Sequence, residues 1–484
     1  MNITNCNTGS LAVFEPNDDN PWDVAAAKHL YRRLENGATI ATLNIAVSKP
    51  VSAAVDTIID RAITAPNSDR VPWSQWSYSD FSDYNEQNNT FRTDQYRAAC
   101  GKIFKGGLKG RMAFFWLNHF VTQIETYNHI PYTYQYWDIL LHHAVGNFKE
   151  LTRAIGLTPA MLAFLNGYEN SKQHPNENYA RELYELFTLG ENNGYTQQDI
   201  EETSRALTGY NTVAEYGAAV TFNPNTFDNS EKTIFGQTGN WDYNDVIEIL
   251  FEQRASEIAH FICEKLYTFF VSPQISEEII AGMAQTFIAN DFEITPVLRQ
   301  LLKSEHFFSE AARATVIKSP FDLCCGFLNE SAFAYDDSTF HITDVIIYAC
   351  NLIGQNIYQP PDVAGWQRDK TWINNNTIGG RWEFMQYLVW LCWEEDQDQF
   401  RQFAKDLSNN SRDTAVITKA IVDHFLAKPL WTDTDYASAE SVLRWEVPQN
   451  YYDNNTWSLD WDSAPYQVVL LIFQIFRMPE FQLK

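Results

Sequence analysis

Residues 174–210 read HPNENYARELYELFTLGENNGYTQQDIEETSRALTGY, and this stretch predicts two helices joined by a short turn. In a helix that begins near Asn178, leucines and a phenylalanine recur at three- and four-residue spacing, as expected for a helix packed on a core. Gly190 stands where a left-handed C-terminal cap is expected, and Thr196 and Asp199 have the spacing of a capping box. The stretch therefore predicts a helical hairpin within a helical protein.

The same two helices carry polar side chains on one face, at one-turn spacing. Carboxylates one turn apart can act as a general acid and base or bind a divalent metal ion. Beside arginines they also form ion-pair networks that only fix how helices pack. Both interpretations stay open. The residues concerned are Asn178, Arg181, Glu182 and Glu185 on the first helix and Glu202 and Arg205 on the second.

Histidine supplies further candidates, because neutral imidazole is a general base near physiological pH. His142 and His143 cannot both face one site, since adjacent residues of a helix point about 100° apart. His119 is the remaining candidate. The catalytic candidates are therefore Glu182, Glu185 and His119. The residues expected to form a binding or structural network are Asn118, Asn178, Arg181, Glu202, Arg205, Asp228 and Trp366.

Composition and motifs exclude several classes of function. Lys and Arg number 35 against 61 Asp and Glu, and the net charge of −26 argues against binding to nucleic acid, which needs basic patches. The seven cysteines form no CxxC pair, and the chain has no HExxH, GxSxG, P-loop, GxGxxG or EF-hand motif. No cofactor is predicted, although a divalent metal ion stays possible at the carboxylates.

Helical patterns follow one another along most of the chain, which predicts an all-α fold in one large multi-helical domain over residues 21–484, with two lobes as a possible division. Residues 1–20 are expected to form a tail, and residues 65–93 and 445–463 irregular loops. Two short β-like runs, AAVTF and KTIFG, predict a small β-hairpin near 216–236. No signal peptide and no membrane span are visible, so the expected compartment is the cytoplasm, with export by another route left open.

Several segments together resemble a bacterial family catalogued as domain of unknown function 1800. They are HLYRRL, FFWLNHFV, ENYARELYELFTLG, GYTQQDIEETSRALTGY, KTIFG, IKSP, PPDVAGW and MPEFQL, in the order of that family and over nearly the whole chain. The family has no assigned activity. Its members often look exported and are encoded beside the family of domain of unknown function 1501, which resembles sulfatases. The resemblance therefore implies a possible protein partner of that second family, and the oligomeric state stays open.

The chain departs from the family pattern at two positions where the family commonly has histidine. Leu117 stands between Trp116 and Asn118, and Phe227 precedes Asp228. A metal site built on those two histidines would have lost both ligands. The turn LENGAT after the first arginine pair also departs from the family's glycine-rich turn, which puts a backbone anion site there in doubt.

Two functions from different classes fit these observations. The first is a scaffold or partner-binding component of a bacterial surface or export-associated system. The alternative is a hydrolase or lyase that acts on a glycan or related polymer through Glu182, Glu185 and His119. A cleft that reaches the carboxylates would favour the enzyme, whereas burial against Arg181 and Arg205 would favour the scaffold.

Overall fold

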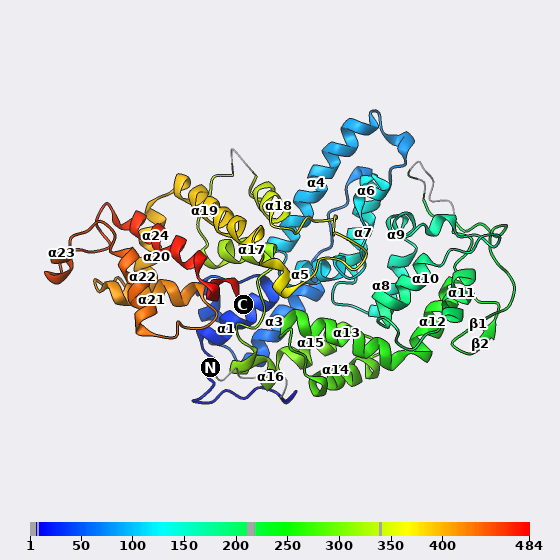
Figure 1. Ribbon diagram of the computed structural model, residues 1–484, viewed down its shortest axis with the longest axis horizontal. Helices are drawn as coiled ribbons and strands as arrows, with labels where there is room; N and C mark the ends of the chain where they lie inside the picture. The colour runs from blue at the N-terminus through cyan, green and yellow to red at the C-terminus, as the bar shows by residue number, and fades with distance from the viewer. Residues whose placement is uncertain (1–5, 7–8, 211–216, 218, 338–340) are drawn as a thin grey trace.

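The computed structural model describes residues 6, 9–210, 217, 219–337 and 341–484. Within these residues the chain forms 24 α-helices and one two-stranded sheet, which confirms the predicted all-α fold. The helices build an elongated body with the C-terminal helices at one end and the β-hairpin at the other (Figure 1). No helix in the described part of the chain is both long and apolar enough to cross a membrane.

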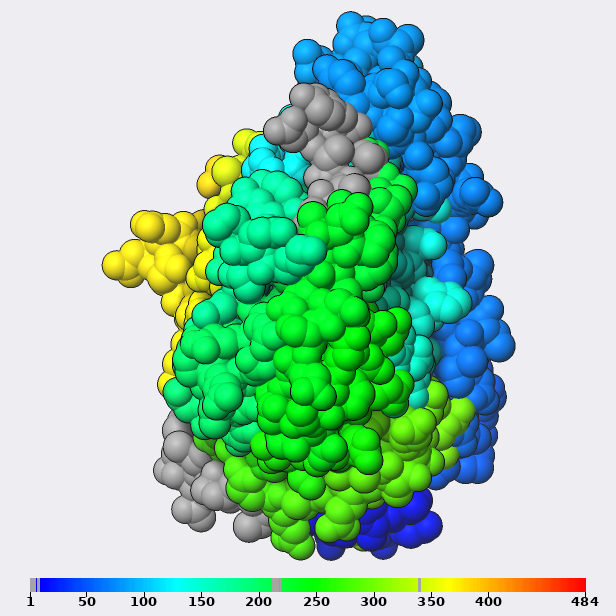
Figure 2. All heavy atoms as spheres, turned by 90° about the vertical axis from the view of Figure 1, so that its right-hand side faces the viewer, coloured from blue at the N-terminus to red at the C-terminus, as the bar shows by residue number. Residues whose placement is uncertain are grey.

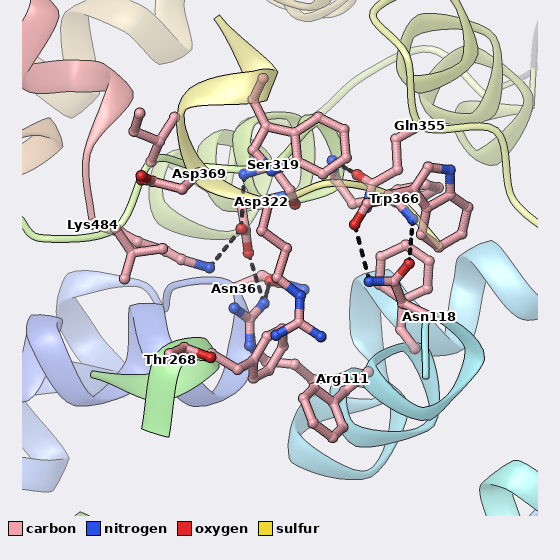
Figure 3. Close-up of a pocket in the computed structure, with 18 of the residues that line it drawn as sticks. Asn36, Arg111, Asn118, Thr268, Ser319, Asp322, Gln355, Trp366, Asp369 and Lys484 are labelled. Carbon is pink, nitrogen blue, oxygen red and sulfur yellow. Dashed lines mark hydrogen bonds and ion pairs between the residues drawn. The ribbon is translucent and has the colours of Figure 1, made fainter. Parts of the chain in front are cut away.

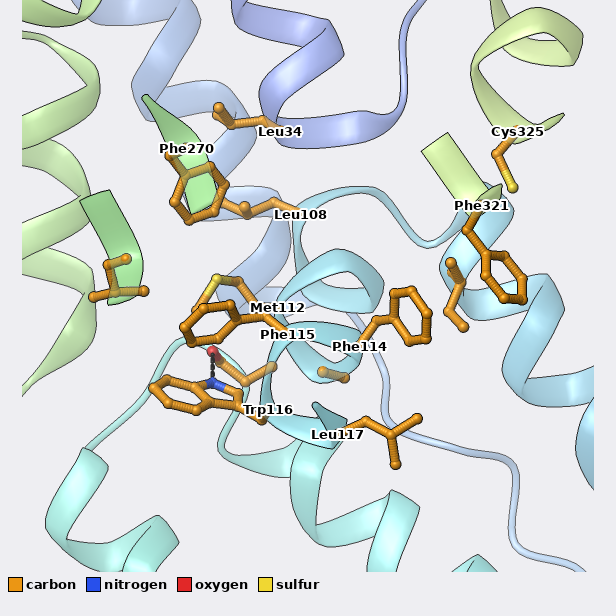
Figure 4. Packing of buried hydrophobic residues seen from close by; sticks show 14 of the residues in the cluster. Leu34, Leu108, Met112, Phe114, Phe115, Trp116, Leu117, Phe270, Phe321 and Cys325 are labelled. Carbon is orange, nitrogen blue, oxygen red and sulfur yellow. Dashed lines mark hydrogen bonds between the residues drawn. The ribbon is translucent and has the colours of Figure 1, made fainter. Parts of the chain in front are cut away.

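The N-terminal helices surround one buried helix, α5. Their bounds are α1 Val24–Glu35, α2 Ile40–Val47, α3 Val51–Thr64, α4 Tyr84–Lys105, α5 Gly107–Leu117, α6 Ile124–Tyr127 and α7 Ile130–His142. Every residue of α5 from 108 to 117 is buried, because α1, α3, α4 and α7 pack around it. A helix that is apolar on most sides is stable only when it is enclosed in this way. Trp116 illustrates the packing: its indole Nε1 donates to the carbonyl of Ala144 at 2.9 Å (Figure 4).

The middle of the chain forms the lobe that carries the hairpin. Its elements are α8 Phe148–Gly156, α9 Pro159–Phe164, α10 Asn178–Glu182, α11 Gln197–Ala206, α12 Tyr243–Gln253, α13 Ala255–Phe270, α14 Glu277–Ala289, α15 Ile294–Leu302 and α16 Glu305–Phe308. Thr196 and Asp199 form the predicted capping box of α11. Seen from this end, the lobe covers the face of the molecule and α4 rises above it (Figure 2).

The C-terminal helices complete the body. They are α17 Pro320–Ser331, α18 Ile342–Leu352, α19 Thr377–Glu395, α20 Asp398–Ser408, α21 Thr414–Phe425, α22 Asp433–Leu443, α23 Gln449–Asp453 and α24 Ala464–Arg477. α17 begins with a capping box in which the side chains of Ser319 and Asp322 each accept a backbone N–H of the other. After α24 the chain returns to the centre of the molecule, where the backbones of Lys484 and Val316 are hydrogen-bonded (Figure 1).

The β-hairpin is present, but it lies slightly further along the chain than the predicted 216–236. β1 (Lys232–Ile234) pairs antiparallel with β2 (Gln237–Gly239). Phe235 and Gly236 form the two-residue turn with φ of 48° and 79°, as a type I′ turn requires. Of the other predicted run, residue 218 lies outside the described residues and residues 219–222 form no strand. The Phe–Gly turn, rather than the apolar run, therefore sets the position of the hairpin.

The segments expected to be irregular contain more local structure than the sequence suggests. α4 begins at Tyr84, within the loop expected over 65–93, because the side chain of Asp83 accepts the N–H of Glu86 and caps the helix. α23 lies within the loop expected over 445–463. In the N-terminal segment, Val13 pairs with Ser304, and Cys6 is buried.

Candidate functional site

Arg181 forms an ion-pair cluster on the surface of the first helix of the 174–210 stretch. Its guanidinium donates to Glu177 at 2.9 Å, to Glu185 at 3.1 Å and to the side chain of Gln197 at 2.9 Å. The side chains of Arg181 and Glu177 are 37% and 36% exposed, so water screens their attraction. Asn178 stands at the start of α10, where its backbone N–H donates to the side chain of Asn176. This cluster joins neighbouring helix turns and connects them to Gln197 at the start of α11.

Glu182 differs from its neighbours because no cation among the described residues forms an ion pair with it. It is half-buried, and burial together with the nearby charge of Glu185 raises the pKa of its carboxyl group, while Arg181 lowers it only in part. From Leu183 to Thr188 the chain is a π-helix, but Glu185 still lies about one turn from its predicted partners, because it bonds to Arg181 and its charge acts on Glu182. The structure therefore brings Arg181, Glu182 and Glu185 close together, as the sequence predicted.

Arg205 connects α11 to the hairpin. Its guanidinium donates to both carboxylate oxygens of Glu202 and to Asp228, each at 2.8 Å. Glu202 also accepts the backbone N–H of Thr233, in β1, at 3.0 Å. Although burial alone would raise it, hydrogen bonds from Ser230 and the charge of Arg205 lower the pKa of Asp228 to about 2. Three of the predicted network residues thus meet, and together they fasten the hairpin.

His119 is buried at the end of α5 and touches backbone rather than the glutamates. Its Nε2–H donates to the carbonyl of Phe187 at 3.0 Å, which leaves Nδ1 to accept from the Lys265 ammonium at 3.2 Å. Lys265 also donates to the carbonyl of Leu186 at 3.3 Å. Burial and the nearby Lys265 hold the pKa of His119 well below its usual range, so the imidazole is neutral. These contacts lock α5 and α13 onto the π-helix, and neither involves Glu182 or Glu185.

Asn118 and Trp366, both predicted network residues, are hydrogen-bonded to each other, a pairing that the sequence did not predict. The side chain of Asn118 accepts the backbone N–H of Trp366 at 2.6 Å and donates to its carbonyl at 3.3 Å. Gly365 has a φ of 85°, and a Cβ atom there would lie 2.4 Å from Oδ1 of Asn118. The PPDVAGW turn is therefore held tightly against the end of α5, and glycine is required for this approach.

The Asn118–Trp366 pair forms one wall of a cavity of about 200 Å³, which we call the Phe269 cavity. Figure 3 shows Asn118 and Trp366 on one side of it and Arg111, Asp322 and Lys484 on the other. The lining combines aromatic rings with a few charged and amide groups. It comprises Asn36, Ile103, Arg111, Phe114, Phe115, Asn118, Thr268, Phe269, Pro273, Val316, Ile317, Ser319, Phe321, Asp322, Gln355, Trp366, Arg368, Asp369, Trp372 and Lys484.

One carboxylate organises the charged side of the Phe269 cavity. Asp322 accepts from Nη1 of Arg111 at 2.7 Å and from the Lys484 ammonium at 2.5 Å. Nη1 of Arg111 also donates to the side-chain oxygen of Asn36. Burial would raise the pKa of Asp322, but Arg111 and Lys484 outweigh it and hold that pKa well below its usual range. Burial and repulsion from Arg111 lower the pKa of Lys484, which is the expected cost of crowding two cations around one acid.

Arg368 adds a third cation to this cavity. Its guanidinium lies 5.1 Å from the ring centre of Phe115 and 5.5 Å from that of Phe269. The guanidinium has no hydrogen bond or ion pair with any residue that the structure describes, and burial lowers the pKa of Arg368 to about 10. A guanidinium held by aromatic faces without a carboxylate is an attractive position for an anion.

The comparison with family models matches residues 29–483 to the family described as "Protein of unknown function (DUF1800)". The chain belongs to this family. No curated protein and no solved structure matches the chain. The match covers nearly the whole chain, so the DUF1800 resemblance seen in the separate segments is confirmed for the protein as a whole.

Segments that carry the DUF1800 resemblance converge on the Phe269 cavity. FFWLNHFV supplies Asn118, IKSP supplies Ser319 and PPDVAGW supplies Trp366. Arg111 and Asp322 were not among the residues predicted from the sequence, although Arg111 stands three residues before FFWLNHFV and Asp322 two residues after IKSP. The short distance in sequence between these two residues and the family segments is the signal by which they could have been found.

The two positions where DUF1800 members commonly have histidine are apolar in structure as well as in sequence. Leu117 is buried in the core, and Phe227 lies beneath the ammonium of Lys232 at 4.9 Å. Within the described residues, no three His, Cys, Asp or Glu side chains are arranged to hold a metal ion.

Proposed function

We propose that the protein is a binding protein for a small anionic molecule, which it holds in the Phe269 cavity. The observation that carries the proposal is a cluster of three cations around one ring. The charged groups of Arg111, Arg368 and Lys484 lie 4.8, 5.5 and 5.8 Å from the centre of Phe269. Two acidic side chains, Asp322 and Asp369, line the same cavity, so its lining has three basic groups and two acidic ones.

Burial makes this excess costly without a counter-charge. Removing a cation from water is unfavourable unless a partner of opposite charge offsets the loss of hydration. Asp322 already interacts with both Arg111 and Lys484. An anion beside Arg368 would offset the remaining repulsion, and aromatic walls would exclude water and strengthen the attraction.

The proposal is tested by calorimetric titration of the purified protein with acetate, benzoate, sulfate and inorganic phosphate. At least one of these anions should bind, and Arg368→Gln should weaken that binding about tenfold or more, since one charged hydrogen bond is worth about 1.5–3 kcal/mol. Arg368 has no ion pair with a described residue, so the variant should fold normally. Arg153→Gln, which changes an arginine paired with Glu248 on the surface, is the matched control and should bind as the wild type does. Failure of all four anions to bind would overturn the proposal.

The two functions expected from the sequence relate to this proposal differently. A partner-binding role, with a protein of the family of domain of unknown function 1501 as the partner, is compatible, because a ligand in the cavity leaves the outer surface free. The hydrolase or lyase ranks second. The raised pKa of Glu182 supports it, but Glu185 is paired with Arg181, and His119 is engaged by Phe187 and Lys265.

A further inference from the structure

A second hollow lies where α2 and α3 meet the junction of α4 and α5, and it shares no lining residue with the Phe269 cavity. It measures about 490 Å³, and we call it the lysine cleft, because Lys102, Lys105 and Lys109 line it. Its lining has four basic side chains, those of the lysines and Arg61, and one acidic side chain, Glu35. The chain as a whole has a net charge of −26. The cleft is therefore a local basic region in an acidic protein, and such a region attracts anions.

The one acidic side chain of the cleft is already engaged. Glu35 accepts from the guanidinium of Arg61. None of the three lysines forms an ion pair with a carboxylate among the residues that the structure describes. Asp69 and Asp94 line a neighbouring hollow that Lys102 and Lys105 also reach, and neither carboxylate pairs with them. The lysine ammonium groups thus remain without a bonded counter-charge.

Neutral oxygen atoms hold two of these ammonium groups close together. Lys102 donates to the backbone carbonyl of Asn67 at 3.0 Å. Lys109 donates to the side-chain oxygen of Asn67 at 2.7 Å and to the carbonyl of Ala65 at 2.5 Å. Burial and the charge of Lys102 lower the pKa of Lys109, and the charge of Asp138 offsets this only in part. An anion placed beside both groups would relieve their repulsion.

Asn329 fixes the third ammonium group. Its Nδ2 donates to the backbone carbonyls of Asn36 and Phe104, at 3.3 and 3.2 Å, which leaves its Oδ1 to accept from Lys105 at 2.8 Å. The same ammonium lies 4.0 Å from the ring centre of Phe104. An ammonium group has three N–H donors, and each lysine of the cleft uses one or two of them on these oxygens. All three lysines therefore keep a donor for a ligand.

Thr39 and Thr42 add a hydroxyl donor to the lining. Their Oγ1 atoms are 3.0 Å apart, and Oγ1 of Thr39 also accepts the backbone N–H of Thr42. One hydroxyl proton occupies the bond between the two oxygens, which leaves the other hydroxyl free to donate. Ammonium and hydroxyl donors together suit the oxygens of a phosphate group, which accept strong hydrogen bonds.

We propose that the lysine cleft binds the diphosphate group of a small molecule. The lysine ammonium is a compact charge that binds phosphate well, whereas the planar fork of arginine matches a carboxylate better. One phosphate group carries about 1.5–2 negative charges, so three lysines without a carboxylate partner match two linked phosphates better than one. Nucleic acid is a poorer match, because its backbone needs an extended basic surface and the protein is acidic overall.

The proposal is tested by calorimetric titration of the full-length wild-type protein with inorganic diphosphate and, separately, with inorganic phosphate, in a buffer free of divalent metal ions. Diphosphate should bind about tenfold or more tightly than phosphate, because its second phosphate forms further charged hydrogen bonds. The affinity for diphosphate should also fall as salt is added. Failure of diphosphate to bind, or binding no tighter than that of phosphate, would overturn the proposal.

Two variants show whether diphosphate lies in the cleft. Lys102→Gln and Lys105→Gln each remove one ammonium group from the lining, and each should weaken diphosphate binding about tenfold or more. Lys105 is exposed and Lys102 is partly exposed, so both variants should fold normally. Lys172→Gln is the matched control, because Lys172 is an exposed lysine outside the cleft, and it should bind as the wild type does. Equal losses in the control and the cleft variants would mean that only net charge matters, and the cleft would be wrong as the site.

Arg368→Gln separates this site from the anion site proposed in the Phe269 cavity. Arg368 lines that cavity and not the lysine cleft, so the variant should leave the affinity for diphosphate unchanged. A loss in Lys102→Gln and Lys105→Gln without a loss in Arg368→Gln supports the cleft, whether or not the Phe269 cavity binds an anion. A loss in Arg368→Gln without a loss in the two lysine variants would place diphosphate in the Phe269 cavity and overturn the cleft as its site.

Discussion

Arg205 and Arg111 both stand between a carboxylate and other polar groups, but they do so at different depths. The side chain of Arg205 is 26% exposed, and its partners Glu202 and Asp228 are 19% and 16% exposed. Arg111 and Asp322 are 5% and 8% exposed. The same chemistry therefore fastens a hairpin in one region and leaves an excess of buried charge in the other. Depth, and not the type of residue, separates the surface clamp from the buried charge cluster.

The largest contrast is expected from Asp322→Asn. This change leaves Arg111 and Lys484 buried without a counter-charge, which should lower the free energy of unfolding by about 3–5 kcal/mol. Asp344→Asn is the control, because its partner Arg97 is 39% exposed and the loss should stay below about 1 kcal/mol. Urea unfolding of both variants checks the comparison, and equal losses would show that depth does not set the cost.

Gly365→Ala tests how tightly the cavity wall is held. The φ of 85° and the close approach to Asn118 should together cost about 2–4 kcal/mol. Gly354→Ala is matched, since Gly354 has a φ of 96° and no atom within 4 Å of the added Cβ. It should cost only the backbone strain of about 1–2 kcal/mol. Thermal or urea unfolding gives both values, and a Gly365 loss no greater than the Gly354 loss would remove the steric explanation.

Burial of Lys265 should also make the stability of the protein depend on pH. Burial lowers the pKa of Lys265 from 10.5 to about 7, so the unfolded chain binds this proton more tightly than the folded protein does. The cost of burying the charged amine is full below about pH 7 and disappears as the pH rises toward 10.5. The free energy of unfolding should therefore increase across that range.

Lys265→Met should therefore flatten the rise in unfolding free energy, by about 1–2 kcal/mol between about pH 7.5 and about pH 9.5. The exposed Lys370→Met is the control and should leave the slope unchanged. Urea unfolding across the range measures both slopes. If the unfolding free energy of Lys265→Met rises with pH as steeply as that of the wild type, burial does not lower the pKa of this amine.

The smallest effect is expected at the surface clamp. Arg205→Met should lower the unfolding free energy by about 1 kcal/mol and loosen the hairpin, seen as faster amide hydrogen exchange in β1 and β2. Arg181→Met removes a more exposed arginine and should change stability by less than about 0.5 kcal/mol. A larger loss at Arg181 than at Arg205 would reverse the order that exposure predicts.

Sequence patterns predicted the local features of both regions well and their joining poorly. The capping box of Thr196 and Asp199 was predictable, because its partners are three residues apart and such contacts follow from helix geometry alone. The pairing of Arg205 with Glu202 follows in the same way. The π-helix was not predictable. Two of its carbonyls, those of Phe187 and Leu186, accept hydrogen bonds from His119 and Lys265, which are distant in the sequence.

The sequence by itself determined the family, the all-α class and the positions of many helix ends. Helical periodicity and caps act over a few residues, so they are written in the local order of the chain. Only the tertiary structure decided the Phe269 cavity. Asp322 is 211 residues from Arg111 and 162 residues from Lys484. Contacts over such distances depend on how complete helices pack, and their energies depend on burial, which no local pattern encodes.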